Sequence, residues 1–375
     1  MNINRRTWMK QSLLASTTIL LAGAPVARGC ASEKPNSQSI NSENLILLNW
    51  NENPFGPPQS AISAVSKCMK DANRYPDELI IKLKKKIARI NSIASENILL
   101  TAGSTEVLSL LGQHAGLQKG EILCPYPTFP TALSFGENAG AKIVKVPLDN
   151  FDKLDLERTL SKITAKTKLV FICNPNNPTG TEVSTEELKR FCRRVPEDVL
   201  ICVDEAYIEY SNVGIGGSMV SLVSELPNLL VVRTFSKVYG LAGLRIGYVM
   251  SSEENIRALS SRHLGFEIST GWPPLAAADA VLDDQEFVSM SIQKNMEGRQ
   301  IVYTAFDDWG VKYNPSSTNF IYARDEYFDK NVVAYLEAVG ILITKWPDMK
   351  KHIRISIGKP ADMRTFVDAI HDFRV

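Results

Sequence analysis

The stretch of sequence that decides the class of this protein is Arg233-Thr234-Phe235-Ser236-Lys237-Val238-Tyr239-Gly240-Leu241-Ala242-Gly243-Leu244-Arg245-Ile246-Gly247-Tyr248. Ser236 precedes Lys237, glycines follow, and Arg245 is the next charged residue. A lysine becomes a Schiff-base nucleophile when a desolvated site or a nearby cation lowers its pKa. Hydroxyl and guanidinium groups bind oxyanions, and glycines let the backbone pass close to a ligand. The segment therefore suits a lysine that holds an aldehyde cofactor with an anionic tail; the alternative is a loop with a surface lysine.

Two further motifs each follow an apolar run that is typical of a buried strand. The run 168–172 leads into Cys173-Asn174-Pro175-Asn176-Asn177-Pro178-Thr179-Gly180, where the prolines and the glycine end the strand in a rigid loop. The run 199–202 leads into Val203-Asp204-Glu205-Ala206-Tyr207. An acid at a strand end suits a carboxylate that faces a cationic ring nitrogen, although an ordinary turn and a helix N-cap are the simpler alternatives. Because ligands of open α/β sheets bind at this edge, the three motifs together predict one site.

With these motifs the chain resembles the pyridoxal-phosphate (PLP) aminotransferases of fold type I, class I/II, and within them the histidinol-phosphate aminotransferase branch. The resemblance runs from about Leu47 to the C-terminus. Besides the three segments above, it is carried by Asn49-Trp50-Asn51-Glu52-Asn53-Pro54-Phe55-Gly56-Pro57, Arg74-Tyr75-Pro76, Gly103-Ser104-Thr105-Glu106, Pro127-Thr128-Phe129, Ser317-Thr318-Asn319-Phe320 and His352-Ile353-Arg354-Ile355-Ser356-Ile357-Gly358.

The order of strand and helix patterns predicts an α/β fold. Strand patterns alternate with helices expected from Ser104, Thr128 and Ser184, which favours a mostly parallel sheet covered on both faces. The resemblance implies a mostly parallel, seven-stranded sheet in a large domain and a smaller α+β domain at the C-terminus. The expected divisions are a signal peptide (1–31), a linker (32–44), an N-terminal arm (45–58), a large PLP-binding domain (59–290) and a small C-terminal domain (291–375).

The resemblance also implies a role for each matching residue around the cofactor ring. Lys237 forms the Schiff base with the aldehyde and moves the substrate proton. Asp204 keeps the pyridine nitrogen protonated, so that the ring accepts electrons. Tyr207 and Asn177 hydrogen-bond to the ring hydroxyl, and Phe129 stacks on the ring; a core aromatic is the alternative for Phe129.

The cofactor phosphate has its own set of implied ligands. Ser104 and Thr105 open a helix directly after a glycine, where free amide groups and the helix dipole favour an anion. The resemblance adds Ser236 and Arg245 to this set. It also implies that Tyr75 reaches the phosphate across the interface of a homodimer.

The implied substrate residues include two departures from the family pattern. Arg354 clamps the substrate carboxylate, Asn51 lines the substrate entrance, and Asn177 also binds the substrate. Phe55 stands where the family has a tyrosine that serves the substrate phosphate. A second phosphate ligand of the family, an arginine, is replaced by Thr344-Lys345. The substrate is therefore expected not to depend on a phosphate group.

The expected activity is transfer of an amino group from an L-amino acid, or from histidinol phosphate, to a 2-oxo acid such as 2-oxoglutarate. A PLP-dependent decarboxylase or β-lyase on the same fold is the alternative, and an exported binding protein without activity is a more distant one. The net charge of +1 gives no indication of a nucleic-acid partner. The histidines and cysteines show no metal-ligand spacing, so no metal is expected.

The first residues read as a leader rather than as part of the fold. Arg5-Arg6 is followed by Trp8 and Lys10, then by a mildly apolar run from Ser12 to Ala24 that is too short to span a bilayer. This pattern resembles a twin-arginine export signal, which implies a periplasmic or otherwise exported protein that engages the export machinery. A basic amphipathic helix on a cytoplasmic protein is the alternative. Cys30 lies in a loose lipoprotein-type cleavage box, although Arg28 departs from the usual small residue.

Overall fold

The computed structural model describes residues 45–263, 270–328, 331–345, 349 and 351–374. The expected signal peptide and linker, with the export signal and Cys30, lie outside the described residues. No helix of the described part is long and apolar enough to cross a membrane.

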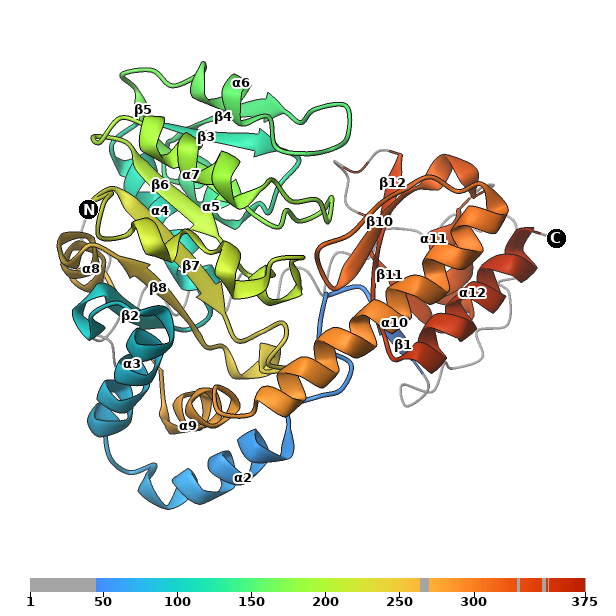
Figure 1. The fold of residues 1–375 in the computed structure, drawn as a ribbon, viewed down its shortest axis with the longest axis horizontal. Helices are drawn as coiled ribbons and strands as arrows, with labels where there is room; N and C mark the ends of the chain where they lie inside the picture. Colours follow the sequence, from blue (N-terminus) through green and yellow to red (C-terminus); the bar gives the residue numbers. More distant parts are fainter. Residues whose placement is uncertain (1–44, 264–269, 329–330, 346–348, 350, 375) are drawn as a thin grey trace, which may run out of the picture. The chain divides into compact units, whose positions relative to one another are not determined.

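A seven-stranded sheet forms the centre of the fold, in the order β2-β8-β7-β6-β5-β3-β4 (Figure 1). The strands are β2 (Ile98–Thr101), β3 (Glu121–Tyr126), β4 (Lys142–Pro147), β5 (Thr167–Cys173), β6 (Leu200–Asp204), β7 (Leu229–Thr234) and β8 (Gly247–Ser251). Strand β8 runs antiparallel to both of its neighbours, β2 and β7, and all other adjacent pairs are parallel. The structure confirms the predicted mostly parallel sheet, and its central strands are near-continuous apolar runs because both faces are covered.

Helices cover both faces of this sheet. The helices α3 (Asp77–Asn91), α6 (Leu156–Leu160), α7 (Thr185–Arg194) and α9 (Trp272–Val281) share one apolar core with the sheet, and α4 (Ser104–Leu117), α5 (Thr131–Asn138) and α8 (Glu253–Ser260) share the other. Alternate residues of one strand enter opposite cores, since successive side chains of a strand point to opposite faces: Val170 and Ile172 enter the first, and Leu169 and Phe171 the second.

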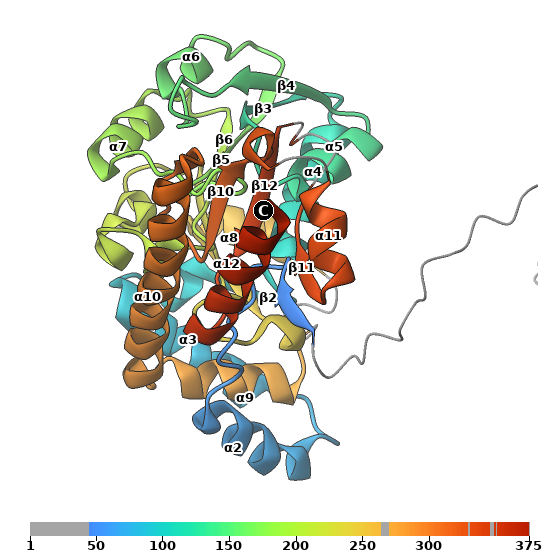
Figure 2. The same ribbon diagram turned by 90° about the vertical axis from the view of Figure 1, so that its right-hand side faces the viewer.

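The C-terminal residues build a smaller α+β layer with its own core. Its antiparallel sheet has the order β12-β10-β9, and a separate parallel pair joins β1 to β11. The elements are β1 (Ile46–Leu48), β9 (Tyr313–Asn314), β10 (Phe320–Arg324), β11 (Ile341–Ile343), β12 (His352–Ser356), α10 (Gln285–Trp309), α11 (Val332–Ala338) and α12 (Pro360–Arg374). In Figure 2, α12 lies in front of these strands, and α10 and α11 flank them to the left and right.

The arm after the linker connects these layers. Its strand β1 pairs with β11 in the register Ile46↔Ile341, after which the chain turns to helix α2 (Gln59–Cys68), which packs on α9. The residues between β1 and α2 therefore pass between the C-terminal sheet and the edge of the large sheet. The boundaries expected for the large and small domains stay predictions.

One helix begins later than expected. The helix predicted from Thr128 begins at Thr131, and Pro130 occupies its N-cap position. A residue before proline is disfavoured in the helical region, so Phe129 stays outside the helix.

Candidate active site

A cavity of about 370 Å³ lies where β5, β6 and β7 end and the C-terminal sheet approaches. The side chains that the sequence predicted for the site and that line this cavity are Asn51, Ser104, Thr105, Phe129, Asn177, Asp204, Tyr207, Ser236, Lys237, Arg245 and Arg354. The carboxyl ends of neighbouring parallel strands thus bring together residues that are far apart in the sequence, as expected for an open α/β sheet.

Lys237 lies in the loop after β7 with its amine in the cavity. Its Nζ donates a hydrogen bond to the carbonyl oxygen of Trp50 over 3.3 Å. Desolvation, and then the positive charge of Arg354, lowers the pKa of Lys237 to about 8. A larger share of the amine is therefore neutral near neutral pH than in a free lysine, which is the form that attacks an aldehyde. Arg245 contributes in the same direction but less than Arg354.

Asp204 is the last residue of β6 and is 2% exposed. Its Oδ1 accepts a hydrogen bond from the Ala206 backbone N–H over 3.1 Å. Burial raises the pKa of Asp204 to about 7, against the opposing charge of Lys237. A cation placed in the cavity would favour the charged carboxylate, so this residue fits a protonated ring nitrogen.

A polar network surrounds the hydroxyl of Tyr207. This hydroxyl oxygen accepts hydrogen bonds from Asn51 Nδ2 over 2.9 Å and from Asn177 Nδ2 over 3.4 Å. Arg354 Nη1 donates to Asn177 Oδ1 over 2.8 Å, and its Nη2 donates to the Asn49 carbonyl oxygen over 2.7 Å. Strand β12, the N-terminal arm and the loop after β5 thereby meet at one point, where the tyrosine can bind a ring oxygen and the arginine an anionic substrate group.

The opposite end of the cavity can bind an anion, and we call it the anion cup. It is formed by Ser104, Thr105, Ser236 and Arg245. Helix α4 begins at Ser104, so its free amide groups face the cavity. Arg245 donates from Nη2 to Thr105 Oγ1 over 3.2 Å and from Nη1 to Ser236 Oγ over 3.4 Å. Gly103 precedes the helix with φ +77°, and a Cβ atom there would lie 2.4 Å from Arg245 Nη2. Glycine is required for this approach, and the donor set fits a phosphate.

Two predicted residues do not line the cavity. Phe55 is half-buried in the arm, and Tyr75 is 75% exposed on the surface between α2 and α3. At the departure from the family pattern, Lys345 forms an ion pair with Asp325. The Thr344 hydroxyl donates to the Asn49 carbonyl oxygen and accepts a hydrogen bond from Arg354 Nη2 over 3.3 Å.

Several lining residues were not predicted as site residues from the sequence. They are Trp50, Glu52, Cys173, Ala206, Thr234, Ala242 and Gly243. All of them lie within the quoted motifs, and Trp50, Glu52 and Ala206 directly adjoin a predicted residue. Sequence proximity to Asn51 was the available signal for Trp50 and Glu52, but it does not show which way a side chain points.

Comparisons with known proteins identify the family of this chain. Residues 43–370 match the family model described as aminotransferase class I and II. The chain is 39% identical over 300 residues to the histidinol-phosphate aminotransferase of Brevibacillus brevis, covering 80% of this chain and 81% of that protein. It is 35% identical over 358 residues to the histidinol-phosphate aminotransferase of Geobacillus thermodenitrificans, covering 94% of this chain and 97% of that protein.

Solved structures show the same architecture. The histidinol-phosphate aminotransferase of Sinorhizobium meliloti in complex with pyridoxal-5'-phosphate has a TM-score of 0.78 and 28% identity, covering 88% of this chain and 90% of that one. The L-threonine-O-3-phosphate decarboxylase of Porphyromonas gingivalis, with a TM-score of 0.72, 20% identity and coverage of 88% of this chain and 99% of that one, shares the fold. The chain belongs to the class I and II aminotransferases, PLP-dependent enzymes of fold type I, and is similar within them to the histidinol-phosphate aminotransferases.

Proposed function

We propose that this protein transfers an amino group to a 2-oxo acid from a donor whose carboxylate binds Arg354 and which carries no phosphate. The observation that carries the proposal is the convergence of a desolvated lysine, a buried carboxylate and an anion cup on one cavity. When bound, PLP supplies an aldehyde that combines with amines and a ring that accepts electrons from the substrate Cα.

The chain's own residues divide the remaining work. Lys237 would bind the aldehyde, and its amine, once displaced by the donor amine, would carry the proton from the substrate Cα to the cofactor carbon. Asp204 keeps the ring nitrogen protonated by charge. Tyr207 and Asn177 bind the ring hydroxyl, and Arg354 orients the donor by binding its carboxylate.

The kind of amino donor can be inferred from the cationic side chains that line the cavity. Among its lining residues the cationic side chains are those of Lys237, Arg245 and Arg354. Lys237 would hold the aldehyde, Arg245 belongs to the anion cup, and Arg354 would bind the donor carboxylate. Lys345 pairs with Asp325 instead. An apolar or aromatic amino acid therefore fits better than a phosphorylated donor. Histidinol phosphate is the second candidate, because the relatives carry that name.

A screen of the purified, PLP-loaded protein against amino acids and histidinol phosphate with 2-oxoglutarate tests the proposal. Product formation should require both the donor and the 2-oxo acid. A decarboxylase or β-lyase would consume the donor without any 2-oxo acid, and that result would contradict the proposal.

We further propose that the enzyme acts as a homodimer. Tyr75 is 75% exposed and does not line the cavity of its own chain, and Trp50 at the cavity is 70% exposed. A second copy that inserts Tyr75 toward the anion cup would cover both residues. Sedimentation of the protein as a monomer at the concentrations used for activity assays would contradict this.

Export is the third part of the proposal and rests on the sequence. Arg5-Arg6 with Trp8 and Lys10 supports a twin-arginine route, which carries folded proteins. Such a route suits an enzyme that must bind its cofactor before it crosses a membrane.

A further inference from the structure

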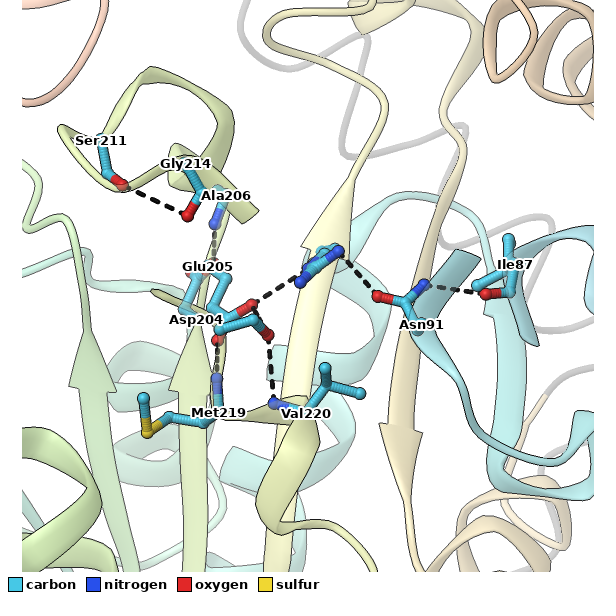
Figure 3. Close-up of polar contacts among 11 residues, drawn as sticks. Ile87, Asn91, Asp204, Glu205, Ala206, Ser211, Gly214, Met219 and Val220 are labelled. Atoms are coloured by element: carbon cyan, nitrogen blue, oxygen red, sulfur yellow. Dashed lines mark hydrogen bonds and ion pairs between the residues drawn. The ribbon is translucent and has the colours of Figure 1, made fainter. Parts of the chain in front are cut away.

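Behind the candidate site lies a buried ion pair that does not line the cavity. Glu205 is 2% exposed and Arg233 is 3% exposed, and Arg233 Nε donates to Glu205 Oε2 over 3.0 Å (Figure 3). Glu205 follows Asp204 directly in the sequence. Arg233 precedes Thr234, which lines the cavity, and the chain then continues to Ser236 and Lys237.

The Glu205 carboxylate is held by three donors from two parts of the chain. Besides Arg233, the Ser218 hydroxyl donates to Oε2 over 2.7 Å and the Met219 backbone N–H donates to Oε1 over 2.7 Å (Figure 3). A carboxylate with this number of directional, charge-assisted bonds has little freedom to move.

Arg233 is anchored on its other side. Its Nη1 donates to Asn91 Oδ1 over 3.0 Å, and Asn91 Nδ2 donates to the Ile87 carbonyl oxygen over 2.8 Å at the end of α3 (Figure 3). The acidic groups of Glu209 and Tyr248 also face this guanidinium. The pair is therefore fixed to a helix as well as to two strands.

The backbone shows why this position matters for the site. Asp204 pairs with Val232 in the ladder between β6 and β7, and the Glu205 N–H donates to the Val232 carbonyl oxygen over 2.8 Å. Beyond this bond the two strands diverge into loops. Because successive side chains point to opposite faces, Asp204 and Thr234 enter the cavity while Glu205 and Arg233 meet on the other side.

Net stability is a poor explanation for such a pair. Desolvation of two charges offsets most of their attraction, and apolar replacements of both partners are often neutral or stabilising. Directional bonds instead set a geometry. We infer that Glu205 and Arg233 are positioning residues that fix the separation of Asp204 and Lys237 and thereby align both with the PLP ring; the inference rests on the proposed function.

The test replaces both charges by apolar side chains of similar length, as Glu205→Met with Arg233→Met. The matched control is Lys86→Met with Asp279→Met. That pair joins α3 to α9 over 2.8 Å, its side chains are 10% and 13% exposed, and neither residue lines the cavity. Both double variants and the wild type are compared by thermal unfolding without PLP, by the PLP dissociation constant, by pH titration of the visible PLP absorbance band, and by kcat and KM.

We expect the Glu205/Arg233 double variant to unfold near the wild-type temperature without PLP. Its PLP dissociation constant should rise and its kcat should fall, each by about tenfold or more, since small misplacements of reacting groups are costly. The pKa of the absorbance band should shift, and KM for the donor should stay unchanged. The control should match the wild type in all four measurements.

If the Glu205/Arg233 double variant keeps the wild-type PLP affinity, absorbance titration and kcat, the positioning role is overturned and the proposed function is not affected. A wild-type protein that carries no PLP would overturn the proposed function together with it. If the double variant does not fold, Ser218→Ala decides, because it removes one donor to Glu205 and leaves the ion pair. The expected rise in the PLP dissociation constant is then about threefold, and an unchanged constant would overturn the role.

Discussion

Arg354 Nη1 lies 2.8 Å from Asn177 Oδ1, so an arginine of the small C-terminal sheet is bonded to the loop that follows β5 of the large sheet. Asn177 in turn contacts the Tyr207 hydroxyl through Nδ2. The residue expected to bind the substrate carboxylate and the residues expected to bind the cofactor ring are thus one network. A donor that binds Arg354 will compete with Asn177 for the guanidinium, which couples substrate binding to the ring contacts.

Lys237→Ala should abolish turnover and the borohydride-reducible adduct with PLP. The reason is that we expect the desolvated amine of Lys237 to form the covalent link, while the anion cup should still bind the cofactor phosphate. Mass spectrometry of the reduced wild-type protein checks the assignment. A reduced adduct on another lysine would refute it.

Asp204→Asn should slow turnover by about 10³-fold or more while the shape of the site is kept. The amide cannot stabilise a protonated ring nitrogen by charge, so the ring becomes a weaker electron acceptor. Single-turnover rates of wild type and variant with the same donor measure the effect. A loss below about tenfold would show that another acid has this role.

The PLP-free protein should show a specific pH dependence of stability. Burial raises the pKa of Asp204 from 3.8 to about 7, so the folded protein binds this proton more tightly than the unfolded chain does. The free energy of unfolding therefore loses this contribution as the pH rises through the window between these two values, by up to about 4 kcal/mol.

Asp204→Asn has no such titration, so the wild type should lose stability relative to this variant as the pH rises from about 4 to about 7. Glu209, whose pKa burial also raises to about 7, is present in both proteins and cancels in the difference. Urea unfolding of both proteins across the window measures it. A difference that is constant with pH would show that Asp204 does not titrate in this range.

The donor should not depend on a phosphate group. Phe55 does not line the cavity, and Lys345 is paired with Asp325, so neither supplies a phosphate ligand there. Values of kcat/KM for histidinol phosphate, phenylalanine, tyrosine and histidine decide the question. A preference of about 100-fold for histidinol phosphate, equivalent to about 2.7 kcal/mol, would refute this prediction and would point to Lys345 as a phosphate ligand.

Arg5→Lys with Arg6→Lys should leave the precursor inside the cell with its cofactor bound. The substitutions keep the positive charge and remove the paired arginines that the export route recognises. Cell fractionation of wild type and variant provides the measurement. Equal export of both proteins would exclude the twin-arginine route, and a wild-type protein that stays in the cytoplasm with residues 1–31 intact would exclude the leader.

The chemistry of the strand ends and the class of fold could be predicted from the amino-acid sequence. Lys237, Asp204 and Asn177 each follow an apolar run, and these runs are the buried strands β7, β6 and β5. Such patterns are local, because a buried parallel strand needs a continuous apolar run and a ligand loop needs glycine, proline or a polar residue directly after it. The helix expected at Thr128 began three residues late, at Thr131, because Pro130 restricts the residue before it.

The way in which distant segments meet could not be predicted from local sequence patterns and follows from the three-dimensional fold. Arg354 and Trp50 reach the cavity because β1 and β12 place the arm and the C-terminal sheet beside the large sheet, and no local pattern encodes that approach. The same holds for electrostatics: the largest charge effect on the pKa of Lys237 comes from Arg354, not from its sequence neighbour Arg245. The pairing of Glu205 with Arg233 likewise arises from the register of β6 and β7, since charges interact through distance in space rather than separation along the chain.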